Sequence, residues 1–151
     1  MRILRRHRLI ELFLVKTLGF TWDEVHDEAE NLEHAVSDLL IDRLDAYMGF
    51  PANDPHGDPI PKSDGTVTSH VSQSLSKRQV GDRFLLVRVL DQSPEFLRFL
   101  GDAGIYVGSE GQVTGRHQTV GTLSVTVAGR ETTLGRDAAE KLLVANPADR
   151  L

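Results

Sequence analysis

The feature that most limits how this chain can fold is a proline-rich break between two stretches of different hydrophobic period. Residues 50–65 hold four of the six prolines, and proline ends helices and interrupts strand pairing. Before the break, apolar residues recur at helical spacing; after it, they form short β-branched runs bounded by glycine. The sequence therefore predicts an α+β protein with a helical domain over residues 1–65, a polar linker over 66–74 and a small β-barrel over 75–151.

Three helices are expected before the break. The first covers residues 2–18 and ends at Gly19. It has more apolar residues than one stripe can hold, which predicts a second packing partner, either the rest of this chain or another copy of it. The second helix begins with Thr21 as N-cap and Glu24 as the other half of a capping box. The third covers residues 38–48 after Ser37 as N-cap, and its expected apolar face is Leu39, Leu40, Leu44 and Met48.

One arc of the second helix carries the chemistry of a metal site. At about 100° per residue, two imidazoles and two carboxylates share this arc: His26, Glu30, Glu33 and His34. Nitrogen and oxygen donors suit divalent first-row metals, and the absence of cysteine removes the thiolate that favours zinc or copper(I). The pattern indicates manganese(II) or iron(II). The same spacing also fits a solvated helix face without a ligand.

Composition narrows the range of functions. A net charge of −5 argues against nucleic-acid binding by the whole chain, because phosphate neutralisation requires a basic surface. The one basic cluster, Arg2, Arg5, Arg6 and Arg8, is expected to be the solvated side of the first helix. With no apolar run of membrane-spanning length and no signal-peptide pattern, we expect a cytoplasmic protein that does not enter a membrane.

Two functional classes other than a metal sensor are compatible with these residues. A small metal-dependent hydrolase would use Glu33 as its base, but the chain shows no convergent nucleophile, oxyanion donor or glycine-rich phosphate loop, so we expect no enzyme. A pure interaction protein would use the barrel to bind a partner and leave the histidines and glutamates solvated. Loss of metal binding on His26→Ala would distinguish a sensor from this interaction protein.

Three sequence segments resemble the diphtheria toxin repressor family of iron- or manganese-dependent bacterial transcription repressors. They are Arg6 to Glu11, Val25 to Asp38 and the loop Asp54 to Pro61. Residues 75–146, with Val107 to Glu110 after a short expected helix at 94–100, resemble the C-terminal SH3-like domain of that family, which is similar to ferrous transport protein A. The resemblance implies a helical metal-binding and dimerisation domain followed by an SH3-like barrel, in a homodimer.

The resemblance also implies two metal positions. An ancillary site would use His7, Glu11 and His26, completed by a side chain of the SH3-like domain for which Asp91 and Glu95 are the candidates. A primary site would use Glu30, Glu33 and His34. Iron-type members have cysteine where this chain has Glu30, so the harder oxygen donor favours Mn²⁺ over Fe²⁺. Histidine ligands bind in the neutral form, so metal occupancy should fall below a pH of about 6.5.

The chain begins at what would be the helix after the winged helix-turn-helix domain of this family. We therefore expect DNA contact only through that domain, which this chain lacks, and expect the primary site to lack one ligand. The resemblance implies the metal-sensing and dimerisation portion of a repressor. The alternatives are an SH3-like interaction protein and a truncated regulator that sequesters metal or forms mixed dimers with a full-length relative.

Overall fold

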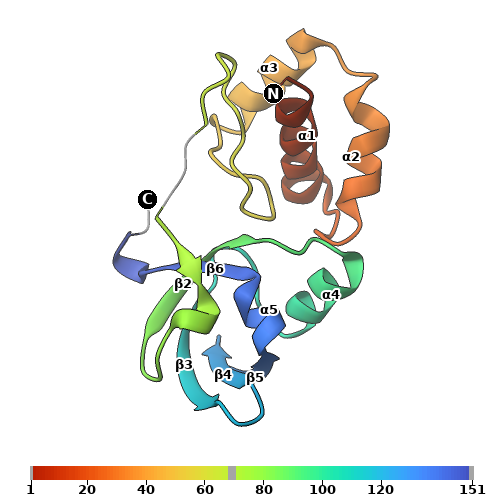
Figure 1. The fold of residues 1–151 in the computed structure, drawn as a ribbon. Helices are drawn as coiled ribbons and strands as arrows, with labels where there is room; N and C mark the ends of the chain where they lie inside the picture. The colour runs from red at the N-terminus through yellow and green to blue at the C-terminus, as the bar shows by residue number, and fades with distance from the viewer. Residues whose placement is uncertain (1, 68–70, 150–151) are drawn as a thin grey trace. The chain divides into compact units, whose positions relative to one another are not determined.

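The computed structural model of this protein describes residues 2–67 and 71–149. The chain forms two compact units, Met1–His70 and Val71–Leu151, with helices in the first and an antiparallel sheet in the second (Figure 1). The predicted α+β class is confirmed. In the described part of the chain, no helix combines the length and the apolar character that crossing a membrane requires.

The helical unit is built around α1 (Arg2–Leu18), which packs against both α2 (Val25–Glu33) and α3 (Asp38–Tyr47) (Figure 1). Gly19 follows α1 with a φ of 75°, a left-handed value that glycine adopts without strain. Apolar side chains on more than one side of α1 are buried, as its composition predicts. The core residues are Leu9, Ile10, Leu12, Leu14, Val25, Ala29, Ile41 and Ile60.

The helix α2 begins at Val25, later than predicted, although the predicted bond between the side chain of Glu24 and the N–H of Thr21 is present. The N–H of Glu24 donates to the carbonyl of Thr21 at 3.2 Å, and the N–H of Thr21 donates to Oε1 of Glu24 at 3.1 Å. These bonds close a turn that precedes the helix, and the cap residue Glu24 makes no capping bond with its side chain. Trp22 in this turn is buried and stacks on His56 with ring centroids 6.0 Å apart, so tertiary packing holds the turn.

The start of α3 follows the prediction, whereas its apolar face does not. Oγ of Ser37 accepts a hydrogen bond from the N–H of Leu40 at 3.1 Å, which confirms the N-cap. The face that packs on α1 carries Ile41 with Leu44 and Met48. Leu39 and Leu40 lie on another side of the helix and are 64% and 45% exposed.

Arginines of α1 tie the helical unit together instead of forming its solvated side, so that expectation is wrong for Arg5, Arg6 and Arg8. Arg5 pairs with Asp42 at 3.2 Å and with Asp45 at 2.9 Å in α3. Arg6 donates to the carbonyls of Glu33 and Val36 and pairs with Asp38. Arg8 donates to the carbonyl of Pro59. The side chain of Arg2 lies outside the described residues.

The second unit is a six-stranded antiparallel sheet with the strand order β1-β6-β2-β3-β4-β5 (Figure 1). Two short helices accompany it: α4 (Pro94–Asp102), which buries Leu97 and Leu100, and α5 (Arg136–Glu140). A 3-10 turn, η1 (Leu75–Lys77), follows the first strand. The strands are β1 (Gln73–Ser74), β2 (Arg83–Val89), β3 (Glu110–His117), β4 (Thr122–Val127), β5 (Arg130–Gly135) and β6 (Leu142–Ala145).

Glycine permits the tightest packing in this sheet. Gly111 of β3 pairs with Phe84 of β2 and with Val127 of β4. A Cβ at position 111 would lie 2.6 Å from Cζ of Phe84, which is a steric clash. Glycine at this position therefore lets the large ring lie directly against the backbone of the next strand.

Candidate metal centre

Glu11 is the centre of the polar cluster in the helical unit. Its side chain is only 2% exposed, and the helical spacing of α1 places it one turn after His7. Oε2 of Glu11 lies 3.4 Å from Nε2 of His7 and 3.8 Å from Nδ1 of His26 in α2. This buried oxygen accepts no hydrogen bond of normal geometry from the described residues. The three side chains offer one donor atom each within 4.8 Å of one another.

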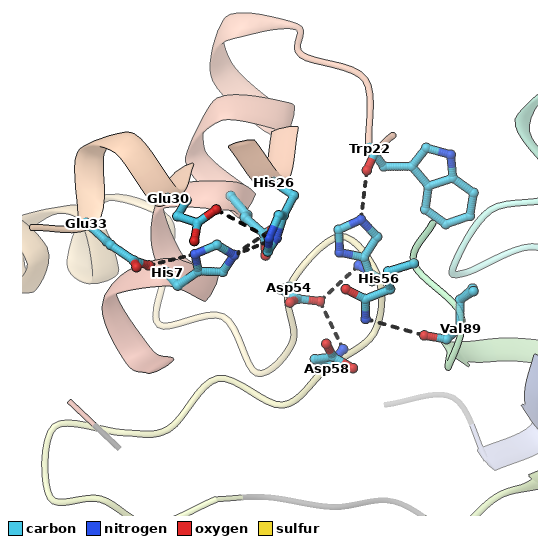
Figure 2. Close-up of polar contacts among 11 residues, drawn as sticks. His7, Trp22, His26, Glu30, Glu33, Asp54, His56, Asp58 and Val89 are labelled. Atoms are coloured by element: carbon cyan, nitrogen blue, oxygen red, sulfur yellow. Dashed lines mark hydrogen bonds and ion pairs between the residues drawn. The ribbon is translucent and has the colours of Figure 1, made fainter. Parts of the chain in front are cut away.

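His7 joins α1 to two positions on α2 (Figure 2). Its Nε2 lies 3.1 Å from Nδ1 of His26, and its Nδ1 lies 2.7 Å from Oε2 of Glu33. The close polar contact with Glu11, the negative charge of that carboxylate and the contact with Glu33 together outweigh burial and raise the pKa of His7 to about 9. At neutral pH, His7 therefore holds a proton that any cation at these atoms would have to displace.

A second polar group is built by the proline-rich loop (Figure 2). Oδ1 of Asp54 accepts the backbone N–H groups of His56 and Asp58, both at 2.9 Å. Nε2 of His56 lies 2.8 Å from the carbonyl oxygen of Trp22, which can only accept, so this nitrogen carries the proton. Oδ2 of Asp54 and Nδ1 of His56 are consequently free, buried and without a hydrogen-bond partner among the described residues.

These loop residues lie close to Glu11. One oxygen of Glu11, one oxygen of Asp54 and one ring nitrogen of His56 lie within 4.8 Å of one another, and all three residues are buried. Burial, with the nearby charges of Asp58 and Glu11, raises the pKa of Asp54 to about 8. Unpartnered oxygen and nitrogen donors with excess negative charge suit a divalent cation of the hard or borderline type.

The structure does not gather the residues predicted for the primary site. Glu30, Glu33 and His34 do not form a compact group of donor atoms among the described residues. Oε2 of Glu33 contacts His7, Oε1 of Glu33 lies 3.4 Å from Nε2 of His34, and Glu30 lies 3.8 Å from His26. His26, Asp27 and Glu30 do form a group, but all three are exposed. The primary set stays a prediction.

The candidate donors from the sheet unit are engaged locally or exposed. Oδ2 of Asp91 lies 3.2 Å from Nζ of Lys141, and Oδ1 accepts the N–H of Ser93 at 2.9 Å. The Ser93 hydrogen bond, aided by Lys141, lowers the pKa of Asp91. Glu95 is exposed in the first turn of α4. Neither residue belongs to a donor group in the described part of the chain, so their role stays a prediction.

Comparison with known proteins identifies the two units. Residues 1–62 match the iron dependent repressor, metal binding and dimerisation domain, and residues 73–146 match the FeoA domain. A solved manganese-dependent transcriptional repressor is 46% identical, with a TM-score of 0.89 over 95% of this chain and 78% of that one. The chain belongs to the family of iron- and manganese-dependent transcriptional repressors.

The match covers only part of the length of the curated relatives. The diphtheria toxin repressor of Corynebacterium diphtheriae is 28% identical over 94% of this chain and 66% of that protein. The iron-dependent repressor IdeR of Mycobacterium tuberculosis is 42% identical over 59 residues, which are 39% of this chain and 26% of that protein. The chain thus covers less than two thirds of these relatives.

Asp54 and His56 are the candidate ligands that sequence reasoning missed. Their loop contributes to the family resemblance, yet it offers no helical or strand period from which the direction of a side chain could be read. The available signal was a carboxylate and an imidazole two residues apart in a segment fixed by prolines.

Proposed function

We propose that this chain is the metal-sensing and dimerising part of a manganese(II)- or iron(II)-dependent transcriptional repressor, which acts by binding and not by catalysis. Two groups in the helical unit would hold the cations: His7, Glu11 and His26, and Glu11, Asp54 and His56. The observation that carries the proposal is Glu11, a buried carboxylate that belongs to both groups and whose Oε2 accepts no hydrogen bond of normal geometry from the described residues.

The donor types support manganese(II) or iron(II). Each group combines carboxylate oxygen with imidazole nitrogen and offers no thiolate, because the chain has no cysteine. Relatives described as manganese-dependent and as iron-dependent repressors are both similar to this chain. The Glu at position 30 adds a further hard donor close to the cluster and favours manganese(II) over iron(II). When bound, the metal would supply the positive charge that neutralises the buried carboxylates.

Metal binding by these residues would fix three segments of the helical unit relative to one another. His7 and Glu11 come from α1, His26 comes from α2, and Asp54 and His56 come from the loop after α3. Holding them together fixes these three segments in one arrangement. In a full-length repressor, this arrangement would bias DNA-binding domains outside the matched part of the chain toward operator geometry.

The exposed apolar residues of the helical unit are the proposed dimer surface. Leu39, Leu40, Tyr47 and Phe50 lie in or directly after α3, and Tyr47 and Phe50 are each 71% exposed. Large apolar side chains gathered on one exposed segment are typical of a surface that a partner covers. Analytical ultracentrifugation tests this assignment: a chain that stays monomeric at all concentrations, in the presence and absence of manganese(II), would contradict it.

Calorimetric titration of the metal-free chain with manganese(II) tests the metal groups. We expect His26→Ala to remove binding at the first group, Asp54→Asn to remove it at the second, and Glu11→Gln to weaken both. Asp64→Asn is the matched control, since this exposed aspartate belongs to neither group. Unchanged stoichiometry and affinity in all three ligand variants would refute the proposal.

The pH dependence of this titration tests whether His7 is a ligand. Because the pKa of His7 is raised to about 9, a proton competes with the cation well above the ordinary range of histidine. Affinity should therefore keep rising between pH 6.5 and about 9, a higher window than an unperturbed histidine gives. Affinity that levels off below pH 7 would contradict the raised pKa of His7, and affinity that does not change between pH 5 and 9 would count against His7 as a ligand.

A further inference from the structure

The sheet unit contains a hollow that the proposed function does not use. Its volume is about 350 Å³, which falls within the size range of small-molecule sites. Three segments distant in the sequence form its walls: η1, the β3–β4 hairpin and α5. Because η1 and α5 contact each other directly, the walls belong to one packed unit.

Positive charge gathers around this hollow in a chain that is acidic overall. Lys77, Arg116 and Arg136 line it, and Glu140 is the one carboxylate beside them, which leaves an excess of two positive charges. The net charge of the whole chain is −5. Within the part of the chain that the structure describes, the side chains of Lys77 and Arg136 form no ion pair or hydrogen bond. Their charges are therefore available to a ligand.

Arg116 is held in place at the wall. Its Nη1 donates to the carbonyl of Ser76 at 2.9 Å and to the carbonyl of Arg78 at 2.8 Å. These two bonds fix the plane of the guanidinium group and leave its other N–H groups free for an anion. A guanidinium that is already ordered loses less conformational entropy when it binds phosphate or carboxylate oxygens.

The rest of the lining combines hydroxyl-bearing residues with apolar ones. Ser76 and Thr122 contribute hydroxyls, and the buried side chains of Leu123 and Ala139 contribute the apolar surface. Several cations with hydroxyl donors match a dianionic phosphate, which offers three acceptor oxygens. The volume of the hollow exceeds what inorganic phosphate alone would fill, and its apolar lining residues could contact an organic group.

We propose that this hollow binds a small phosphate monoester, with its phosphate held by Arg116, Arg136 and Lys77 and its organic part against Leu123 and Ala139. The proposal is independent of the metal groups, which lie in the other unit, so either can fail without the other. In a regulator, such a site would let a phosphorylated metabolite act on the sheet unit.

Titration of the metal-free ¹⁵N-labelled full chain with AMP, followed by NMR, tests the site. We expect saturable shifts in the amides of η1, residues 116–123 and α5, weaker binding of inorganic phosphate and none of uncharged adenosine. The double variant Lys77→Gln with Arg136→Gln should weaken AMP binding at least about tenfold, because two charge-assisted contacts are lost. Both residues are exposed, and the spectrum itself reports whether the variant is folded.

A matched control removes the same charge elsewhere. Lys62→Gln with Arg83→Gln changes two exposed cationic residues outside the hollow and should leave AMP binding unchanged. Equal weakening in both double variants would show non-specific attraction and overturn the proposal. Shifts that map to other residues, or no saturation at millimolar AMP, would overturn it as well.

Discussion

The helical unit and the sheet unit bury different chemistry. Among the described residues, the buried polar side chain of the sheet unit is Ser124, whereas the helical unit buries four carboxylates and an imidazole: Glu11, Glu33, Asp54, His56 and Asp58. Buried carboxylates destabilise a fold unless a proton, a cation or a donor neutralises them. Solution conditions should therefore control the stability of the helical unit, while apolar packing should control that of the sheet unit.

A cavity in the core of the sheet unit tests whether that unit depends on packing alone. Leu86 in β2 is 1% exposed, and Leu86→Ala should cost about 3 kcal/mol of stability by leaving a cavity. Hydrogen exchange of sheet amides should accelerate, while manganese(II) stoichiometry stays unchanged. The exposed Leu90 offers a control, since Leu90→Ala should have an effect below about 0.5 kcal/mol. Loss of metal uptake in Leu86→Ala would show that the two units are not independent.

Manganese(II) should have the converse effect. At a free concentration of about 100 times its Kd, it should stabilise the helical unit by about 2.7 kcal/mol, because it binds the folded state. Hydrogen exchange with and without the ion should show added protection in α1 and α2 and none in β2 to β6. Equal added protection in both units would contradict the expectation that the ion stabilises only the helical unit.

Replacing Asp54 should separate the metal-free states at low and high pH. The pKa of Asp54 is about 8 in the folded chain, against an ordinary value of 3.8. The stability linked to its protonated form is therefore fully present below pH 3.8 and is lost as pH rises through about 8. At pH 8 the metal-free Asp54→Asn variant should be more stable than the wild type by about 2 kcal/mol, with little difference near pH 4. Urea denaturation at both pH values measures this, and a variant that is less stable at pH 8 would contradict it.

The N-cap of α3 should make a smaller contribution to stability than these buried groups. Ser37→Ala removes the side-chain acceptor for the N–H of Leu40 and should cost about 1 kcal/mol. The loss should be the same with and without manganese(II), since the cap touches neither metal group. Ser63→Ala, at an exposed loop position, is the control with no expected change. A metal-dependent loss would show that α3 responds to the cation directly.

Local signals in the sequence were sufficient for much of the fold. The helices, the Ser37 cap and the glycine after α1 depend on neighbours within a few residues, and the structure bears these predictions out. The start of α2 failed because packing of the buried Trp22 on His56, distant in the sequence, holds a turn there. The helical period likewise could not tell which side of α3 would face α1.

For the candidate site too, the contacts between residues near in the sequence were predictable and the contacts between distant residues were not. His7 and Glu11 share a helix face, and the proposed grouping with His26 followed from family motifs. The meeting of Glu11 with Asp54 and His56 joins residues more than forty positions apart through an irregular loop. No periodicity in the sequence encodes that contact, because hydrogen bonds inside the loop and the bond from Arg8 to Pro59 create it.

Arg6 of α1 contacts both the end of α2 and the start of α3. One guanidinium group binds the carbonyls of Glu33 and Val36, where α2 ends, and the carboxylate of Asp38, where α3 begins. Arg6 therefore connects the end of α2 to the first turn of α3, which also carries the exposed Leu39 and Leu40. A single side chain thus links the helix that carries His26 to the segment proposed as the dimer surface.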